Sequence, residues 1–200
     1  MNSLFPSEKI TFDLPNAEIE YYPNFFDAEK SKMLFEKLLN EIPWQQDNIT
    51  VFGKTHPQPR LTCLFGNEGK PYSYSNIVMQ PHHWNPLLMF IKNEIEEVCL
   101  ENFTTVLLNL YRDGKDSNGW HADNEKELGR NPVIASVSFG AERSFHLQHN
   151  TITDAKLKIT LENGSLLLMK GETQHFWKHQ IPKTAKSIAP RINLTFRIIK

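Results

Sequence analysis

A histidine and an aspartate stand two residues apart in the stretch GWHADNE, which spans residues 119–125. Side chains two residues apart on a β-strand point to the same face, so His121 and Asp123 can aim an imidazole and a carboxylate at one metal ion. A second imidazole from elsewhere completes a set of two histidines and one carboxylate. Such a set leaves three octahedral positions open and suits non-haem Fe(II). The pair alone is a weak signal, because two polar residues at a loop edge give the same pattern.

Several other histidines could supply the second imidazole. The candidates are His56, His82, His83, His146, His149, His175 and His179. His175 and His179 lie four residues apart in HFWKH, as in a helical zinc site, but the segment lacks the glutamate of HExxH. A lone histidine is more often a solvated or hydrogen-bonded side chain than a ligand. The residues alone therefore leave the third ligand open.

The C-terminal run APRINLTFRII, residues 189–199, reads as a strand with one polar face. That face carries Arg191, Asn193, Thr195 and Arg197. Two arginines directed into a protein core are costly without an anionic partner, and a bound dianion would satisfy them through bidentate hydrogen bonds. The alternative is an exposed edge strand whose polar residues face solvent, with Leu194 and Phe196 forming the core.

Two helices and a set of strands must position these residues. One helix is expected within residues 25–42, with Asp27 as its cap and Met33, Leu34, Leu38 and Ile42 as its apolar stripe. A second helix is expected from Pro86, capped by Asn85. Residues 1–23 are expected to be irregular, and residues 44–79 hold turns and short β-like pieces. After residue 102 the chain has many short runs rich in β-branched and aromatic residues. These features predict an α+β, mainly β fold: a jelly-roll core with the N-terminal helices packed on it.

Length and composition agree with one globular domain. The chain has 200 residues, 40% of them hydrophobic, and a formal net charge of -1, so no global basic signature points to nucleic acid. Cys63 and Cys99 form no CxxC pair, so neither a disulfide framework nor a thiolate zinc site is predicted. We find no signal peptide and no membrane-span pattern. We therefore expect a soluble intracellular protein, cytoplasmic, or nuclear if the source is a eukaryote.

Four motifs, taken together and in this order, resemble the AlkB family of Fe(II)- and 2-oxoglutarate-dependent dioxygenases, and its DNA-repair branch in particular. They are NLYRDGKDSNGWHADNE, IASVSFGAERSF, GSLLLMKGETQHFWKHQIPK and APRINLTFR. The resemblance runs from Phe52 to the C-terminus and implies a double-stranded β-helix. It divides the single domain into a helical and nucleotide-recognition extension over residues 1–101 and a jelly-roll core over residues 102–200. Because the sequence stops after its last strand, no appended domain is expected.

The resemblance also implies a role for individual residues. The iron ligands would be His121, Asp123 and His179, so that His175 is not a ligand. The cosubstrate 2-oxoglutarate would contact Asn109, Tyr111, Arg191, Asn193, Thr195 and Arg197. Substrate contacts would come from Phe52, Gly53, Lys54, Arg60, Tyr72, Tyr74 and Asn124. Phe52 would be the finger that enters the base stack, Tyr74 would stack on the extracted base, and Arg60 and Lys54 would touch the DNA backbone.

The implied activity is oxidative removal of alkyl groups from DNA bases such as 1-methyladenine and 3-methylcytosine. The cofactors would be Fe(II), 2-oxoglutarate and O2, and the products formaldehyde, succinate and CO2. We expect the partner to be alkylated duplex DNA and the protein to be a monomer. Asn124 stands where relatives often have a second acidic residue, which leaves the base preference open. The alternatives are a related dioxygenase acting on RNA or protein, and a metal-binding jelly roll that oxidises nothing.

Overall fold

The computed structural model describes residues 8–51, 53–68, 72–74 and 77–200. Its main element is a seven-stranded sheet, the larger sheet. In spatial order the strands of the larger sheet are β1 (Ile10–Thr11), β2 (Glu18–Tyr22), β13 (Ser165–Lys170), β10 (Ile134–Gly140), β15 (Arg191–Arg197), β8 (Thr105–Tyr111) and β5 (Leu61–Gly66). The polar-faced C-terminal run is therefore a central strand, flanked by β10 and β8, and not an exposed edge.

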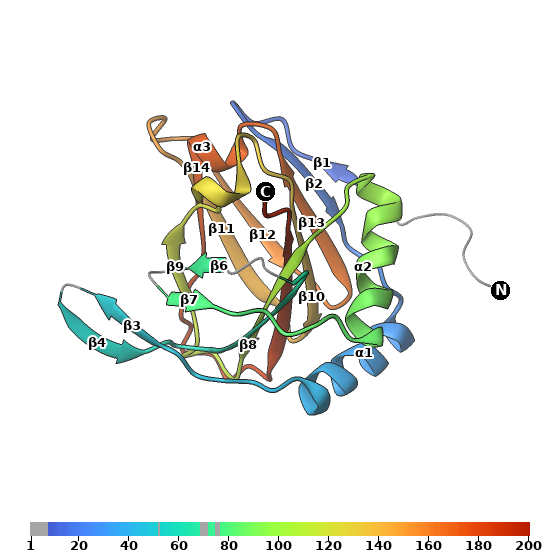
Figure 1. The fold of residues 1–200 in the computed structure, drawn as a ribbon. Helices are drawn as coiled ribbons and strands as arrows, with labels where there is room; N and C mark the ends of the chain where they lie inside the picture. Colours follow the sequence, from blue (N-terminus) through green and yellow to red (C-terminus); the bar gives the residue numbers. More distant parts are fainter. Residues whose placement is uncertain (1–7, 52, 69–71, 75–76) are drawn as a thin grey trace.

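A four-stranded sheet, the smaller sheet, faces the larger one (Figure 1). Its strands in spatial order are β12 (Lys156–Leu161), β11 (Arg143–His149), β14 (Trp177–Ile181) and β9 (Asn118–His121). Among the described residues, two antiparallel strand pairs are not hydrogen-bonded into either sheet. They are β3 (Asn48–Val51) with β4 (Lys54–Pro57), and β6 (Tyr72–Tyr74) with β7 (Ile77–Met79). A 3-10 turn, Lys126–Leu128, follows β9. This two-sheet architecture confirms the predicted mainly β jelly roll.

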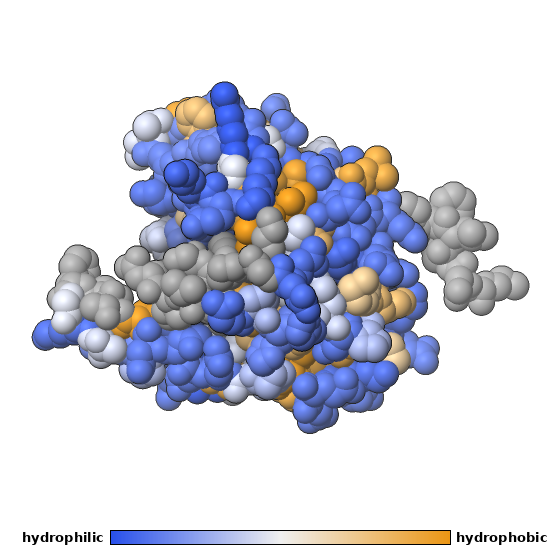
Figure 2. Space-filling view, viewed as in Figure 1, coloured by the Kyte–Doolittle hydropathy of each residue, from blue (hydrophilic) through white to orange (hydrophobic). Residues whose placement is uncertain are grey.

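Two helices cover the outer face of the larger sheet. Helix α1 (Ala28–Glu41) begins at the Asp27 cap, and α2 (Pro86–Cys99) begins at the Asn85 cap; each cap side chain accepts a backbone N–H, as predicted. The predicted apolar stripe of α1 is wrong at one position, since Met33 is 44% exposed while Leu34 is fully buried. Hydrophobic side chains reach the surface on this helical side of an otherwise largely hydrophilic view (Figure 2).

Alternation along β15 divides the core into two layers. Ile192, Leu194 and Phe196 pack in a cluster between the larger sheet and the helices. Arg191, Asn193, Thr195 and Arg197 point the other way, into the space between the two sheets. A second apolar cluster, which includes Leu107, Leu147 and Trp177, packs between the sheets. The polar face of β15 thus lies inside the sandwich, where its side chains line a pocket.

The N-terminal part of the chain contributes more to the sheet than its sequence suggests. The prediction of an irregular start is wrong, because β2 pairs with β13 over its full length. Within residues 44–79, for which the sequence predicts only turns and short β-like pieces, β5 pairs with β8 and forms the other edge strand of the larger sheet. Strands from both sides of the predicted division at residue 101 therefore share one sheet. Within the described ranges, no helix is long and apolar enough to cross a membrane.

Candidate metal centre

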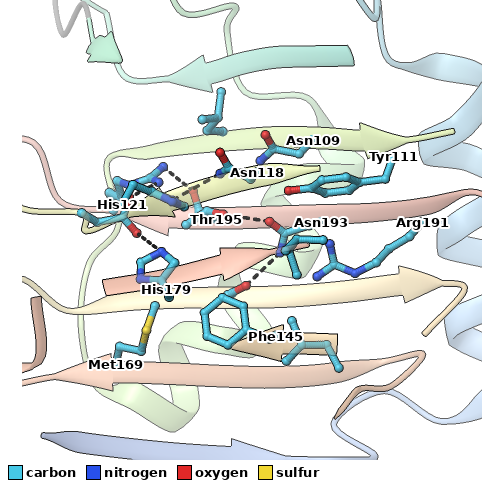
Figure 3. A pocket seen from close by; sticks show the side chains of 16 residues that line it. Asn109, Tyr111, Asn118, His121, Phe145, Met169, His179, Arg191, Asn193 and Thr195 are labelled. Carbon is cyan, nitrogen blue, oxygen red and sulfur yellow. Dashed lines mark hydrogen bonds and ion pairs between the residues drawn. The ribbon is translucent and has the colours of Figure 1, made fainter. Parts of the chain in front are cut away.

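Three side chains converge at one end of the space between the sheets, and Figure 3 labels the two histidines among them, His121 and His179. His121 is the last residue of β9, Asp123 follows two residues later, and His179 lies in β14 directly opposite His121. Their ligand atoms all lie within 4.8 Å of one another, and the two imidazole centroids are 4.2 Å apart. Two imidazoles and one carboxylate at this spacing can hold a six-coordinate metal ion with positions left open.

Asp123 reaches the site differently from the prediction. β9 ends at His121, so Asp123 lies in the following loop and not on the same strand. The loop is held instead by Gln174, whose Oε1 accepts the Asp123 backbone N–H at 2.8 Å. Gln174 lies in the short helix α3 (Thr173–Phe176) and is 1% exposed. No sequence signal identified Gln174, because a glutamine one residue before a histidine has no special pattern.

A buried arginine keeps Asp123 ionised. Nη2 of Arg197 donates to Oδ1 of Asp123 at 2.8 Å, and both side chains are almost fully buried. Burial on its own raises the pKa of Asp123, but the Arg197 guanidinium, helped by His179 and His121, outweighs it and holds the pKa well below its usual range. The other carboxylate oxygen, Oδ2, lies 3.7 Å from Nε2 of His179. The predicted contact of Arg197 with the cosubstrate stays a prediction; what the structure shows is its hydrogen bond to Asp123.

Both histidines are held in the neutral state that binds metals. Burial, reinforced by the neighbouring His121 ring, lowers the pKa of His179 to about 3, and burial also lowers the pKa of His121. Nδ1 of His121 lies 2.7 Å from the carbonyl oxygen of Gly119, which can only accept, so Nδ1 carries the proton. The lone pair of the ring is then on Nε2, which faces the site beside Asn118 at 3.2 Å.

The far end of the same pocket is cationic. Arg191 is 1% exposed, and its Nη2 donates to the Ser138 hydroxyl at 2.9 Å. Its Nε and Nη1 are buried and find no hydrogen-bond partner among the described residues. Burial lowers the pKa of Arg191 to about 10, so the group remains charged near neutral pH. A buried guanidinium with two open donors fits a carboxylate, which accepts from both at once.

The remaining residues predicted to hold the cosubstrate line the same pocket. Asn193 and Asn109 face each other across β15 and β8, as do Arg191 and Tyr111. Thr195 donates to the amide oxygen of Asn193 at 3.0 Å. Phe145 and Met169, which sequence reasoning missed, also line the pocket. The lining thus joins three metal-ligating groups at one end to a cationic subsite at the other, which fits a metal together with a dicarboxylate.

The predicted substrate residues have three outcomes. Phe52 lies outside the described residues, and for Tyr72 and Tyr74 only the backbone, in β6, is described. Gly53, Lys54 and Asn124 are exposed, so they can meet a partner. Arg60 is 3% exposed and donates through Nε to Oδ1 of Asn109 at 2.7 Å. The prediction that Arg60 touches the DNA backbone is therefore wrong, because its guanidinium is buried and hydrogen-bonded to Asn109 in the pocket wall.

We expect Gln174→Leu to weaken Fe(II) binding roughly 10- to 100-fold, the usual cost of losing a partner that orients a metal ligand. Leucine removes the acceptor for the Asp123 N–H, so the loop that carries the carboxylate is no longer fixed. Metal titration of the purified variant measures the change. Gln174→Glu keeps an acceptor oxygen at the same place and should restore most of the affinity. Equal metal affinity of the leucine variant and the native protein would contradict this role for Gln174.

Comparison with known sequences gives the following matches. Residues 18–197 match the family model described as the 2OG-Fe(II) oxygenase superfamily. The human protein called alpha-ketoglutarate-dependent dioxygenase alkB homolog 3 is 43% identical over 187 residues, covering 89% of this chain and 65% of that protein. Human DNA oxidative demethylase ALKBH2 is 36% identical over 188 residues, covering 89% of this chain and 72% of that protein. The chain thus spans slightly less than two thirds of the first of these relatives.

Solved structures share the fold at low sequence identity. A chain titled the structure of OsALKBH1 superposes with a TM-score of 0.68 at 14% identity, covering 96% of this chain and 100% of the other. A prolyl hydroxylase from Trichoplax adhaerens, solved with a peptide of hypoxia inducible factor, superposes with a TM-score of 0.61 at 14% identity, covering 90% and 83%. These likenesses confirm the jelly-roll architecture.

Proposed function

Because the chain belongs to the 2OG-Fe(II) oxygenase superfamily and, within it, to the AlkB family, we propose that it removes alkyl groups oxidatively from nucleic acid bases, with DNA as its substrate. As a member of this superfamily its cofactor is Fe(II), and its cosubstrates are 2-oxoglutarate and O2. The lesions we propose are 1-methyladenine and 3-methylcytosine.

One observation carries the proposal: a single pocket contains both the His121, Asp123 and His179 set and the open donors of Arg191. A jelly roll that only bound a metal would gain nothing from a buried guanidinium with two unpaired donors at the far end of its cavity. A dicarboxylate that binds the metal at one end and Arg191 at the other accounts for both features. This arrangement supports an oxidising enzyme over a metal-binding module.

The residues of the chain bind and orient the reactants. His121, Asp123 and His179 would occupy one face of the metal, and Arg197 keeps the Asp123 carboxylate ionised and in place. Arg191 would take the distal carboxylate of 2-oxoglutarate, beside Tyr111, over whose ring the guanidinium lies at 5.2 Å. When bound, the iron would activate O2, one oxygen atom of which would oxidise 2-oxoglutarate to succinate and CO2 while the other would hydroxylate the methyl carbon, whose adduct releases formaldehyde. The apolar walls, Phe145 among them, exclude bulk water from this end of the pocket.

Support for a duplex substrate comes from the β3–β4 hairpin, which projects from the sandwich (Figure 1). Val51 pairs with Lys54, and the sequence between them is Phe52-Gly53. Gly53 has a φ of 76°, a conformation that favours glycine in a tight turn. An exposed lysine and an aromatic residue at such a turn suit a wedge that fills the gap left by a base flipped out of the stack.

The substrate class is tested with one methylated sequence in three forms. The oligonucleotide carries a single 1-methyladenine as single-stranded DNA, as duplex DNA, or as RNA, and mass spectrometry measures loss of the methyl group. We expect demethylation of both DNA forms to exceed that of RNA. Faster demethylation of the RNA form would show that RNA, and not DNA, is the preferred substrate. Failure of all three, with metal and 2-oxoglutarate bound, would overturn base demethylation.

Phe52→Ala is expected to slow demethylation of duplex DNA more than that of single-stranded DNA. A base in a duplex must be unstacked at a cost of a few kcal/mol, whereas a single strand needs no wedge. Initial rates on the two DNA forms, each relative to the native protein, measure the difference. Lys32→Ala, a truncation on the exposed side of α1, is the matched control and should leave the ratio unchanged. An equal fall in rate on duplex and single-stranded DNA would show that Phe52 does not act as the finger.

A further inference from the structure

The outer face of the smaller sheet carries basic, amide and aromatic side chains. The β11–β12, β11–β14 and β14–β9 pairings place nine side chains on this face, away from the metal centre, among them Ser144 and Thr160. The other seven we call the basic face; they are Trp120, His146, Gln148, Lys156, Lys158, Lys178 and Gln180. Three are lysines, and none of the four strands contains an aspartate or a glutamate. An acid-free sheet face in a chain of net charge -1 is a local positive surface.

The strand register aligns these side chains in two rows. Lys158 pairs with His146, and His146 pairs with Gln180. On β9, His121 pairs with His179 and Asn118 with Ile181, and the β-bulge between these pairs places Gly119 and Trp120 together opposite Gln180, at the end of this row. In the second row Lys156 pairs with Gln148, which in turn pairs with Lys178. The basic face therefore runs from the lysines of β12 to the indole at the β9 edge.

A groove crosses the basic face. It has a volume of about 400 Å³, and its lining includes Trp120, His146 and Lys158. Trp120 is 41% exposed, a large apolar surface for an isolated side chain on a sheet. Burial, together with the Lys158 ammonium, lowers the pKa of His146. An aromatic platform among amines is the pattern that binds single-stranded nucleic acid, because the bases stack and the phosphates pair with lysines.

The basic face adjoins the proposed active site through one strand. His121 points inward to the metal centre and Trp120, the residue before it, points outward. β9 is the edge strand of the smaller sheet, so nothing in that sheet lies beyond it. A nucleic acid strand that places one base in the pocket can pass around this edge and continue over the outer surface.

We propose that, when the nucleic acid substrate is single-stranded, the basic face binds the stretch next to the base held in the pocket, with one base stacked on Trp120 and phosphates on Lys156, Lys158 and Lys178. This inference rests on the proposed function for the identity of the polymer. It extends the substrate contact beyond the pocket, to nucleotides that flank the lesion. Substrate length and salt then become determinants of affinity.

The first test measures binding of an unmethylated single-stranded oligonucleotide of roughly 16 nucleotides, the upper site size of one single-strand-binding fold. The Lys156→Glu/Lys158→Glu variant is expected to bind roughly tenfold more weakly, and its log K against log salt slope should flatten by at least about 1.4, the value for two lost phosphate contacts. Trp120→Ala is expected to weaken binding roughly tenfold, within the range for one base stacked on an aromatic ring.

The matched control is Lys32→Glu/Lys37→Glu, which makes the same charge change on the exposed side of α1. It should bind like the native protein. Turnover of a methylated trinucleotide, which is too short to reach the β12 lysines, should be equal in the native protein, the β12 variant and the α1 control. Unchanged oligonucleotide binding by the β12 variant and by Trp120→Ala would overturn the proposal, as would the same loss in the α1 control. Because binding is measured without turnover, this result is independent of whether any methylated base is a substrate.

Discussion

The His121→Ala protein is expected to form no succinate and to leave methylated bases intact, while it folds as the native protein does. His121 supplies one of three ligands, and its Nε2 is the ring nitrogen that faces the site. The ring lies at the end of an edge strand and makes a hydrogen bond to Gly119. Its loss should change the free energy of unfolding by about 1 kcal/mol or less. Metal titration, thermal unfolding and succinate assays measure the three quantities.

Asp123→Ala is expected to behave differently, although it removes a ligand of the same site. Alanine leaves the Arg197 guanidinium buried without its carboxylate, a change that typically costs about 3–5 kcal/mol of stability. Two ligands of one site would ordinarily give equivalent variants, but because of the Asp123–Arg197 ion pair only the His121 variant is expected to fold like the native protein. Succinate formation by the alanine variant at either ligand, with iron removed and restored in the same assay, would contradict the ligand assignment.

Arg191→Lys is expected to raise the 2-oxoglutarate concentration needed for half-maximal rate by roughly 100-fold. Lysine keeps the charge but offers a point donor in place of the planar fork that binds a carboxylate through two hydrogen bonds. The native guanidinium leaves Nε and Nη1 open for this purpose. Steady-state rates with 2-oxoglutarate varied, at saturating metal and substrate, measure the change.

The Arg191→Met variant tests separately how Arg191 affects 2-oxoglutarate binding and how it affects the stability of the fold. In the ligand-free protein Arg191 is a buried charge with incomplete hydrogen bonding, so methionine should leave the unfolding temperature unchanged or raise it. The native protein should gain about 2.7 kcal/mol from 2-oxoglutarate and metal at 100 times the dissociation constant, and the methionine variant much less. Equal stabilisation of both proteins by 2-oxoglutarate would exclude Arg191 as its anchor.

Much of the site could be predicted because strand alternation is local. Arg191 to Arg197 alternate polar and apolar over seven residues, and any buried strand with that pattern presents its polar side chains to one cavity. The caps at Asp27 and Asn85 were equally predictable, since a cap is decided within four residues. The choice of His179 among the other histidines needed the resemblance, because nothing local relates residue 179 to residue 121.

What could not be predicted depends on contacts between distant segments. β2 is recognisable as a strand only through its pairing with β13, more than 140 residues later. The burial of Arg60 follows from β5 closing the sheet beside β8, which brings its guanidinium to Asn109. Gln174 matters because α3 packs under the Asp123 loop. In each case tertiary packing overrides what the local sequence suggests.

The most direct measurement is succinate formation by the purified protein with Fe(II), ascorbate and 2-oxoglutarate, with and without duplex DNA that carries 1-methyladenine. The proposed function predicts that the damaged duplex raises the rate of succinate formation and that formaldehyde appears at the same additional rate. Succinate that forms at the same rate without the DNA would support the dioxygenase assignment but would exclude DNA as its substrate. No succinate from protein with iron demonstrably bound at His121, Asp123 and His179 would contradict the central claim.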